Sequence, residues 1–239
     1  MDTGNRISVE TNANSIDTFY RRTNFISYLL YQENQSSAQR KVRPQHLIIS
    51  HCNCSTKNVK QKTPGCVWTI GHSTRTIDHF ISMLQAFQIE LVADIRSFPG
   101  SKRYPHFNKE ALESSLPGYG ISYTHIEELG GRRPAHANSK NSAWKHPAFR
   151  GYADYMETGE FEKGIRQLEE LAQDKRTAFM CSEAVWWRCH RSLVSDYLKV
   201  HGWLVYHIME VGKAEEHPYT KPAKIVDGKL SYASDSLLF

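Results

Sequence analysis

The sequence lacks the features of secreted and membrane proteins. Its 239 residues contain five cysteines, a small and odd number that does not form a disulfide framework. A reducing, cytoplasmic location is therefore expected. No stretch approaches the roughly 18 consecutive apolar residues of a membrane span, and residues 1–14 lack the apolar core of a secretory signal. We expect a soluble protein without a membrane partner.

The chain has little excess charge. Thirty Lys and Arg residues exceed 25 Asp and Glu residues, which gives a net charge of +5. This balance suits a phosphate-bearing small molecule or a nucleic acid as a partner, and it is equally typical of ordinary solubility. The hydrophobic content of 40% is sufficient for one sizeable core.

The first 65 residues differ in composition from the remainder. Residues 1–14 and 32–45 are polar and should not form a core, whereas a short helix within 19–31 and a short strand over 46–50 are compatible with the residues present. Cys52 and Cys54, with the distant Cys66, suggest zinc, but a second close pair of ligands is missing. We therefore predict a partly disordered extension over 1–65 and an α/β domain over 66–239.

Apolar periodicity in the second region alternates between strand and helix. Short apolar runs predict strands at 67–70, 91–96, 121–126, 177–180 and 203–209. Helical spacing predicts helices at 77–87, from Asn108, at 147–156, at 161–172 and from about 189. Alternating strands and helices predict a single domain with a mainly parallel sheet flanked by helices. The tail from His217 is expected to lie across the domain rather than to add a sheet layer.

Polar side chains follow three of the predicted strands at the point where each strand ends. These strand-end residues are His72 and Ser73, then Asp94 and Arg96, then Cys181 and Glu183. The carboxyl ends of parallel strands meet at one edge of a sheet, where ligands commonly bind. We therefore expect the three sets to converge on one site.

The segment 97–146 contains many further side chains that could contact a ligand. Prominent among them are Arg103, Tyr104, His106, Phe107, Tyr119, Arg132 and Arg133. The turn Leu129-Gly-Gly-Arg-Arg-Pro134 presents two guanidiniums. A glycine-rich basic loop either binds phosphate or simply reverses the chain, and the local sequence is compatible with both.

A set of short motifs occurs along the second region in a fixed order: Gly71-His-Ser73, Asp94-Ile-Arg96-Ser-x-Pro99, Phe107-Asn108, Gly120-Ile-x-Tyr123, Leu129-Gly-Gly131, Cys181-x-Glu183 and Cys189-His-Arg191. Together these motifs resemble the domain of unknown function 488 family. The resemblance covers roughly residues 67–239, including His217-Pro and the ending 232–239, and its combined motifs are specific although each alone is weak. It implies that these positions form one site on an α/β domain. The resemblance does not imply any particular reaction.

Cys181 invites comparison with cysteine phosphatases and rhodaneses. Those enzymes hold a thiolate in a loop that closes on an arginine after five intervening residues. Here six residues separate Cys181 from Arg188, and the loop contains Glu183 and two tryptophans. Because a reactive thiolate needs electropositive surroundings, Glu183 argues against this chemistry.

A zinc or iron site is chemically sound if its ligands are Cys181, Cys189 and His190. A fourth ligand would come from Asp94, Glu183 or His72. Adjacent Cys and His ligands are unusual, and neighbouring side chains at a helix start point about 100° apart. Cys189 and His190 are therefore not expected to contact the same small atom, and we assign no residue to a metal.

The preferred interpretation is an enzyme that acts on a nucleotide or nucleic acid by hydrolysis or transfer. Its predicted catalytic residues are Asp94, Glu183, Cys181 and His190, with carboxylates as acid and base. Its predicted substrate-binding residues are His72, Ser73, Arg96, Tyr104, Arg132 and Arg191, with arginines holding phosphate. His72 and His190 could move protons near neutral pH. One of Trp186 and Trp187 could stack on a base while the other packs in the core.

Two other functional classes stay open. The first is a metalloenzyme with Cys and His ligands, and the second is a non-catalytic module that binds nucleic acid. The structural alternatives are that Asp94 forms an ion pair with Arg96 or Arg191, that the cysteines are small buried hydrophobes, and that His72 caps a helix.

Overall fold

The computed structural model describes residues 65–234. The short helix and strand expected near the start of the chain, and the cysteines Cys52 and Cys54, lie outside the described residues. Within residues 65–234, no helix is both long enough and apolar enough to cross a bilayer.

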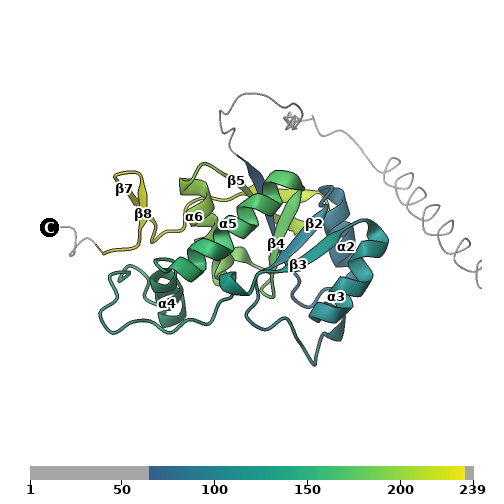
Figure 1. Ribbon diagram of the computed structural model, residues 1–239, viewed down its shortest axis with the longest axis horizontal. Helices are drawn as coiled ribbons and strands as arrows, with labels where there is room; N and C mark the ends of the chain where they lie inside the picture. The colour runs from purple at the N-terminus through teal and green to yellow at the C-terminus, as the bar shows by residue number, and fades with distance from the viewer. Residues whose placement is uncertain (1–64, 235–239) are drawn as a thin grey trace, which may run out of the picture. The chain divides into compact units, whose positions relative to one another are not determined.

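A six-stranded sheet organises the domain (Figure 1). In spatial order its strands are β3 (Ser122–His125), β2 (Leu91–Asp94), β4 (Thr177–Cys181), β1 (Cys66–Gly71), β5 (Leu204–Glu210) and β6 (Lys213–Glu216). The first five strands are parallel, and β6 pairs antiparallel with β5. The predicted mainly parallel sheet is therefore confirmed. Because β4 lies between β1 and β2, the ends of all three strands are adjacent.

Helices cover both faces of this sheet. One face packs against α2 (Ile77–Ala86) and α3 (Lys109–Ser115), and the other packs against α4 (Pro147–Tyr155), α5 (Gly159–Asp174) and α6 (Arg191–Val200). Side chains along β1 alternate between the two faces of the sheet. Val67 packs on the side of α4, α5 and α6, and Trp68 packs on the side of α2 and α3. This is the two-sided burial that makes strands of parallel sheets almost wholly apolar.

The N-termini of α2, α4 and α5 each carry a residue that favours the start of a helix. The hydroxyl of Thr76 accepts a hydrogen bond from the backbone N–H of His79 at the start of α2. Thr158 does the same for Phe161 at the start of α5. Pro147 occupies the first turn of α4, where its missing N–H costs no hydrogen bond. Four short 3-10 turns complete the segments between these elements: η1 (Pro105–Phe107), η2 (Leu116–Tyr119), η3 (Glu127–Leu129) and η4 (Trp186–Arg188).

The C-terminal segment departs from the sequence-based expectation. The strand β6 extends the main sheet, and β7 (Lys224–Val226) pairs with β8 (Lys229–Ser231) in a separate two-stranded sheet. The tail from His217, which was expected to lie across the domain rather than to add a sheet layer, thus contains a small two-stranded sheet, and β6 is a strand that was not predicted. Both pairings depend on short turns, in which Gly212 and Gly228 adopt positive φ, and β6, β7 and β8 are too short to show a strand period.

Asp196 on α6 attaches this segment to the domain. The carboxylate is fully buried and accepts hydrogen bonds from the hydroxyls of Thr220 and Tyr232. It also accepts one from Nε2 of His217, at 3.0 Å. Buried carboxylates are stable only when paired in this way, so α6 and the tail form one unit.

A series of hydrogen bonds runs on from this carboxylate into the sheet. Nδ1 of His217 lies 2.8 Å from Nε2 of His207, and Nδ1 of His207 lies 3.0 Å from the hydroxyl of Thr69. The Arg191 guanidinium donates to the same hydroxyl at 3.0 Å. Each imidazole can thus donate with one nitrogen and accept with the other, as a neutral ring requires.

Candidate functional site

A pocket of about 840 Å³ opens at the carboxyl ends of β1, β2 and β4. Most of the predicted site residues line it, namely His72, Ser73, Arg96, Tyr104, Arg132, Cys181, Glu183 and His190. Two predicted site residues, Asp94 and Arg191, are buried beside the pocket without lining it. The structure therefore brings the three strand ends together as expected.

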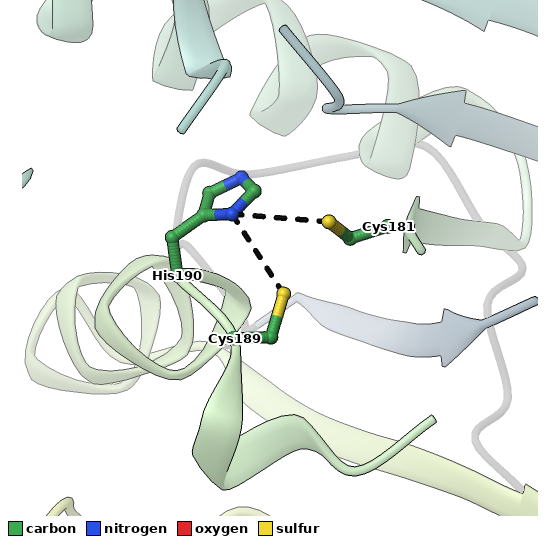
Figure 2. Close-up of side chains that lie close together, drawn as sticks. All are labelled: Cys181, Cys189 and His190. Carbon is green, nitrogen blue, oxygen red and sulfur yellow. Dashed lines mark hydrogen bonds between the residues drawn. The ribbon is translucent and has the colours of Figure 1, made fainter. Parts of the chain in front are cut away.

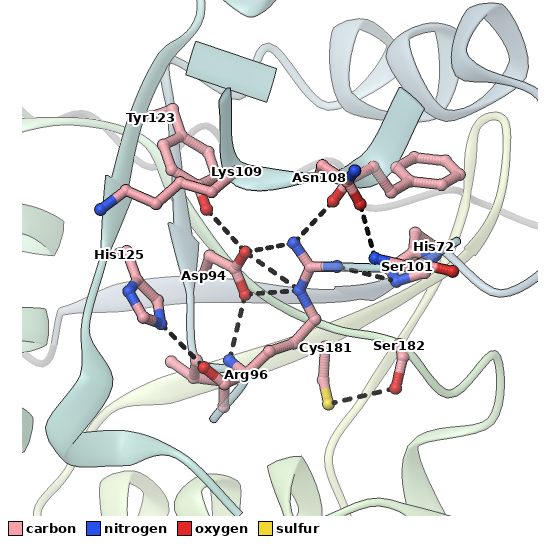
Figure 3. Close-up of polar contacts among 12 residues, drawn as sticks. His72, Asp94, Arg96, Ser101, Asn108, Lys109, Tyr123, His125, Cys181 and Ser182 are labelled. Atoms are coloured by element: carbon pink, nitrogen blue, oxygen red, sulfur yellow. Dashed lines mark hydrogen bonds and ion pairs between the residues drawn. The ribbon is translucent and has the colours of Figure 1, made fainter. Parts of the chain in front are cut away.

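Asp94 and Arg96 form a buried ion pair at the end of β2 (Figure 3). The guanidinium donates from Nε to Oδ1 at 2.9 Å and from one terminal nitrogen to Oδ2 at 2.5 Å. The Tyr123 hydroxyl donates to Oδ2 at 2.7 Å. Burial disfavours the charged guanidinium, but hydrogen bonds to Asp94 and its charge outweigh this effect and raise the pKa of Arg96. Both carboxylate oxygens are occupied, so Asp94 fixes Arg96.

His72 extends this pair toward the pocket. A terminal nitrogen of Arg96 lies 3.2 Å from Nε2 of His72, and Nδ1 of His72 lies 3.0 Å from the Ser73 carbonyl oxygen. The ring stacks on Phe107 with centroids 4.3 Å apart. Burial, together with the Arg96 charge, lowers the pKa of His72 to about 4. The ring is therefore neutral near pH 7, with Nδ1–H donating and Nε2 accepting.

Cys181, Cys189 and His190 form the most compact group in the pocket (Figure 2). Nδ1 of His190 lies 3.8 Å from Sγ of Cys181 and 3.7 Å from Sγ of Cys189. Nε2 of the same ring lies 3.0 Å from the Ile95 carbonyl oxygen. A carbonyl only accepts hydrogen bonds, so in the neutral ring Nε2 carries the proton and Nδ1 is the nitrogen whose lone pair faces both sulfurs.

This arrangement overturns the expectation that Cys189 and His190 point apart. That expectation assumed that both residues lie on a helix, whereas Cys189 is extended with φ −132° and ψ 146°, and α6 begins at Arg191. Both side chains consequently turn toward the end of β4. Burial opposes ionisation of Cys189, but the hydrogen bond from Cys181 and the charge of Arg191 lower its pKa below the usual value. The same hydrogen bond and burial raise the pKa of Cys181.

Arg191 is buried beside the pocket and holds the backbone of the loop that follows β4. The side chain is 1% exposed, and one terminal nitrogen donates to the carbonyl oxygens of Glu183 and Ala184 at 2.7 and 3.3 Å. The other donates to Thr69. These contacts fix the backbone that carries Glu183.

The basic turn after η3 contributes one of its two arginines. Arg132 has a positive φ of 59° and lies 5.4 Å from the ring centroid of Phe98, at the pocket wall. Arg133 instead lies 3.8 Å from the ring centroid of Tyr155 and donates to the Gly130 carbonyl. The turn both reverses the chain and presents a cation.

The two tryptophans also divide between core and pocket. Trp186 is buried, stacks on His207 with centroids 4.4 Å apart and donates from its indole nitrogen to Glu215. Trp187 is 51% exposed and lines the pocket. The expected division is confirmed, and Trp187 is the residue free to stack.

Several pocket residues were not predicted as part of the site. They include Ser97, Phe98, His146, Phe149, Tyr152, Ser182 and Arg188. Phe98 and Ser182 stand inside motifs that had been noticed, so extending each motif to its intervening residues would have found them. Phe149 and Tyr152 belong to the apolar stripe of α4, and helical periodicity does not show that one end of that stripe borders a pocket.

Comparison with known proteins places the chain in one family. Neither the curated proteins nor the solved structures gave a match. A family model described as Domain of unknown function DUF488 matches residues 76–198, which include β2, β4, the basic turn and the Cys181 to Arg191 segment. Since this match spans just over half of the 239 residues, the protein belongs to the DUF488 family.

Proposed function

We propose that the pocket is the active site of an enzyme that acts by hydrolysis or transfer on a nucleotide or nucleic-acid substrate. The observation that carries this proposal is the combination of side chains at its wall: the guanidiniums of Arg132 and Arg188, the exposed aromatic ring of Trp187 and the carboxylate of Glu183. Guanidiniums suit phosphate oxygens, aromatic rings suit bases, and a carboxylate can move a proton.

Charge at the wall supports a phosphate-bearing substrate. Within the described part of the chain, neither Arg132 nor Arg188 forms an ion pair with an acid. Both side chains are exposed. Two cations without counter-charges attract an anion, and bidentate guanidinium contacts are especially suited to phosphate.

Glu183 is the residue to which we assign proton transfer. Among the described residues that line the pocket it is the sole Asp or Glu. Asp94 has both oxygens occupied by Arg96 and Tyr123, so we give it the role of positioning Arg96. His72 then holds the other side of that guanidinium.

The test is a substrate screen with the full chain. Nucleotides and short DNA and RNA strands are incubated with the protein, and products are identified by chromatography and mass spectrometry. Glu183→Gln should reduce turnover by about 10²-fold or more while the dissociation constant stays nearly unchanged. The matched control is Glu170→Gln, an exposed glutamate on α5, which should leave turnover unaltered. Full turnover by Glu183→Gln would reject the assignment.

A non-catalytic nucleic-acid module is the second candidate, and one observation favours it. Phe98 is 69% exposed, and the Arg132 guanidinium lies over its ring, which makes a stacking platform that needs no acid. This function predicts salt-dependent binding that is equal in the native protein and in Glu183→Gln, with no product from any substrate in the screen.

A further inference from the structure

We propose that Cys181, Cys189 and His190 bind one Zn²⁺ ion, with its fourth coordination position directed into the pocket. The proposal rests on the geometry of these three side chains and is independent of which substrate the enzyme accepts. All three residues line the pocket. Their ligand atoms lie within 4.8 Å of one another.

The distances between the ligand atoms are close to those of a tetrahedral zinc site. With Zn–S near 2.3 Å and Zn–N near 2.0 to 2.1 Å, tetrahedral angles place sulfur and nitrogen about 3.5 Å apart. The two Nδ1 to Sγ distances are 3.7 and 3.8 Å. A shift of a few tenths of an ångström would bring both pairs into the coordination sphere of one ion.

The imidazole already has the orientation and tautomer of a metal ligand. Its Nε2–H donates to the Ile95 carbonyl, and a histidine that binds a metal through one nitrogen usually donates from the other to such a group. Nδ1 is thereby left unprotonated and turned to both sulfurs (Figure 2). No rotation of the ring is needed for binding.

The backbone around the ring leaves room beside Nδ1. Gly131 approaches so closely that a Cβ atom at this position would lie 3.0 Å from Nδ1 of His190. The glycine therefore keeps that side of the ring free of side-chain carbon. Cys181 is held at the end of β4, which pairs with strands on both sides, so one ligand comes from the most constrained part of the sheet.

The chemical types of the three ligands favour Zn²⁺ over other metal ions. Two thiolates and one neutral imidazole carry two negative charges, which balance Zn²⁺, and sulfur with nitrogen at tetrahedral geometry is typical of zinc. Three protein ligands with an open fourth position are the arrangement of catalytic rather than structural zinc sites, because water or substrate takes the remaining position.

The experiment is metal analysis of the full chain purified without added metal or chelator. Because Cys52 and Cys54 are potential ligands of a second metal ion, every measurement is made in a Cys52→Ser, Cys54→Ser background. We expect about one zinc ion per chain. Cys181→Ser, Cys189→Ser and His190→Gln should each lower the bound zinc about tenfold or more. The control is Cys66→Ser. Cys66 begins β1, whereas the pocket lies at the other end of that strand, so this variant should retain the ion.

A second pair of measurements uses the unaltered site and a variant that keeps a metal ligand. Replacing the metal with Co²⁺ in the background protein should give the intense visible absorption of a tetrahedral ion and charge-transfer bands from thiolate. His190→Cys, which supplies another zinc ligand, should retain metal where His190→Gln does not. A protein that takes up neither Zn²⁺ nor Co²⁺ would overturn the proposal. So would a Cys181–Cys189 disulfide in the freshly purified protein, detected by mass spectrometry before and after reduction.

Discussion

The guanidinium of Arg191 donates a hydrogen bond to the backbone carbonyl of Glu183 at 2.7 Å, although only 1% of the arginine is exposed. An arginine at a sheet edge usually suggests anion binding. Here it instead connects α6 to the loop that carries the pocket carboxylate, and Arg188, three residues earlier, lines the pocket.

Arg191 and Arg188 should respond differently to removal of charge. Arg191→Met leaves two carbonyls and a hydroxyl without their donor and should lower the free energy of unfolding by about 3 kcal/mol. Arg188→Met should change it by less than about 0.5 kcal/mol and weaken binding of phosphate-bearing ligands. Urea denaturation and ligand titration measure the two effects. A stable Arg191→Met protein that has lost only ligand affinity would show that Arg191 contacts the ligand after all.

Gly71 should not tolerate a side chain. A Cβ atom there would lie 1.7 Å from the carbonyl oxygen of Glu183, so Gly71→Ala must displace the backbone of the pocket loop. Overpacking of this kind costs about 1 to 3 kcal/mol, and turnover should fall with it. In the control Gly118→Ala, the added carbon has open space around it. Equal melting temperatures for the two variants would contradict the close approach.

Asp94 should matter for stability more than its neighbour Tyr123. Asp94→Asn leaves the 6% exposed Arg96 without its counter-charge, which should cost about 3 to 5 kcal/mol. Tyr123→Phe removes one hydrogen bond and should cost about 1 kcal/mol. Denaturant unfolding of both variants tests the difference. If Asp94→Asn folds as stably as the native protein and loses turnover, the carboxylate takes part in the chemistry, as the sequence first indicated.

Stability should decrease in mild acid. Burial, the neighbouring His217 ring and the charge of Arg191 lower the pKa of His207 to about 2, whereas an unfolded histidine has a pKa near 6.5. Below about pH 6.5 the unfolded chain therefore binds a proton that the folded chain does not, and this group alone lowers the free energy of unfolding by up to about 1.4 kcal/mol per pH unit.

Urea unfolding measured from about pH 7.5 to pH 5 shows the size of this effect. His207→Gln removes the titrating ring, so its stability should depend less steeply on pH than that of the native protein. An unchanged slope in this variant would assign the acid sensitivity to other groups.

The architecture could be predicted from the sequence because its signals are local. Strand and helix periods identified the five parallel strands and the helices between them, and Pro147 marked the start of one helix. The strands that were missed, β6 to β8, are only three or four residues long. They are formed through pairing and turns, which apolar periodicity does not report.

The candidate site could be predicted only as a set of residue types at one sheet edge. Which member faces the pocket depends on the path between β4 and α6. Extended Cys189 brings His190 beside Cys181, and buried Arg191 faces the opposite way. Neither direction follows from sequence spacing. It depends on the residue at which α6 begins, because the side chain of a residue in the extended segment before the helix points differently from that of the same residue within the helix.

The position of β1 has a practical consequence for anyone expressing part of this protein. The strand lies between β4 and β5, yet it precedes residue 76 and β5 follows residue 198, the limits of the family match. A fragment trimmed to those limits would lose His72 and three of the six strands, β1, β5 and β6, and would expose one edge of β4 to water and to other chains. Fragment boundaries should therefore be drawn from strand pairing and not from the matched range.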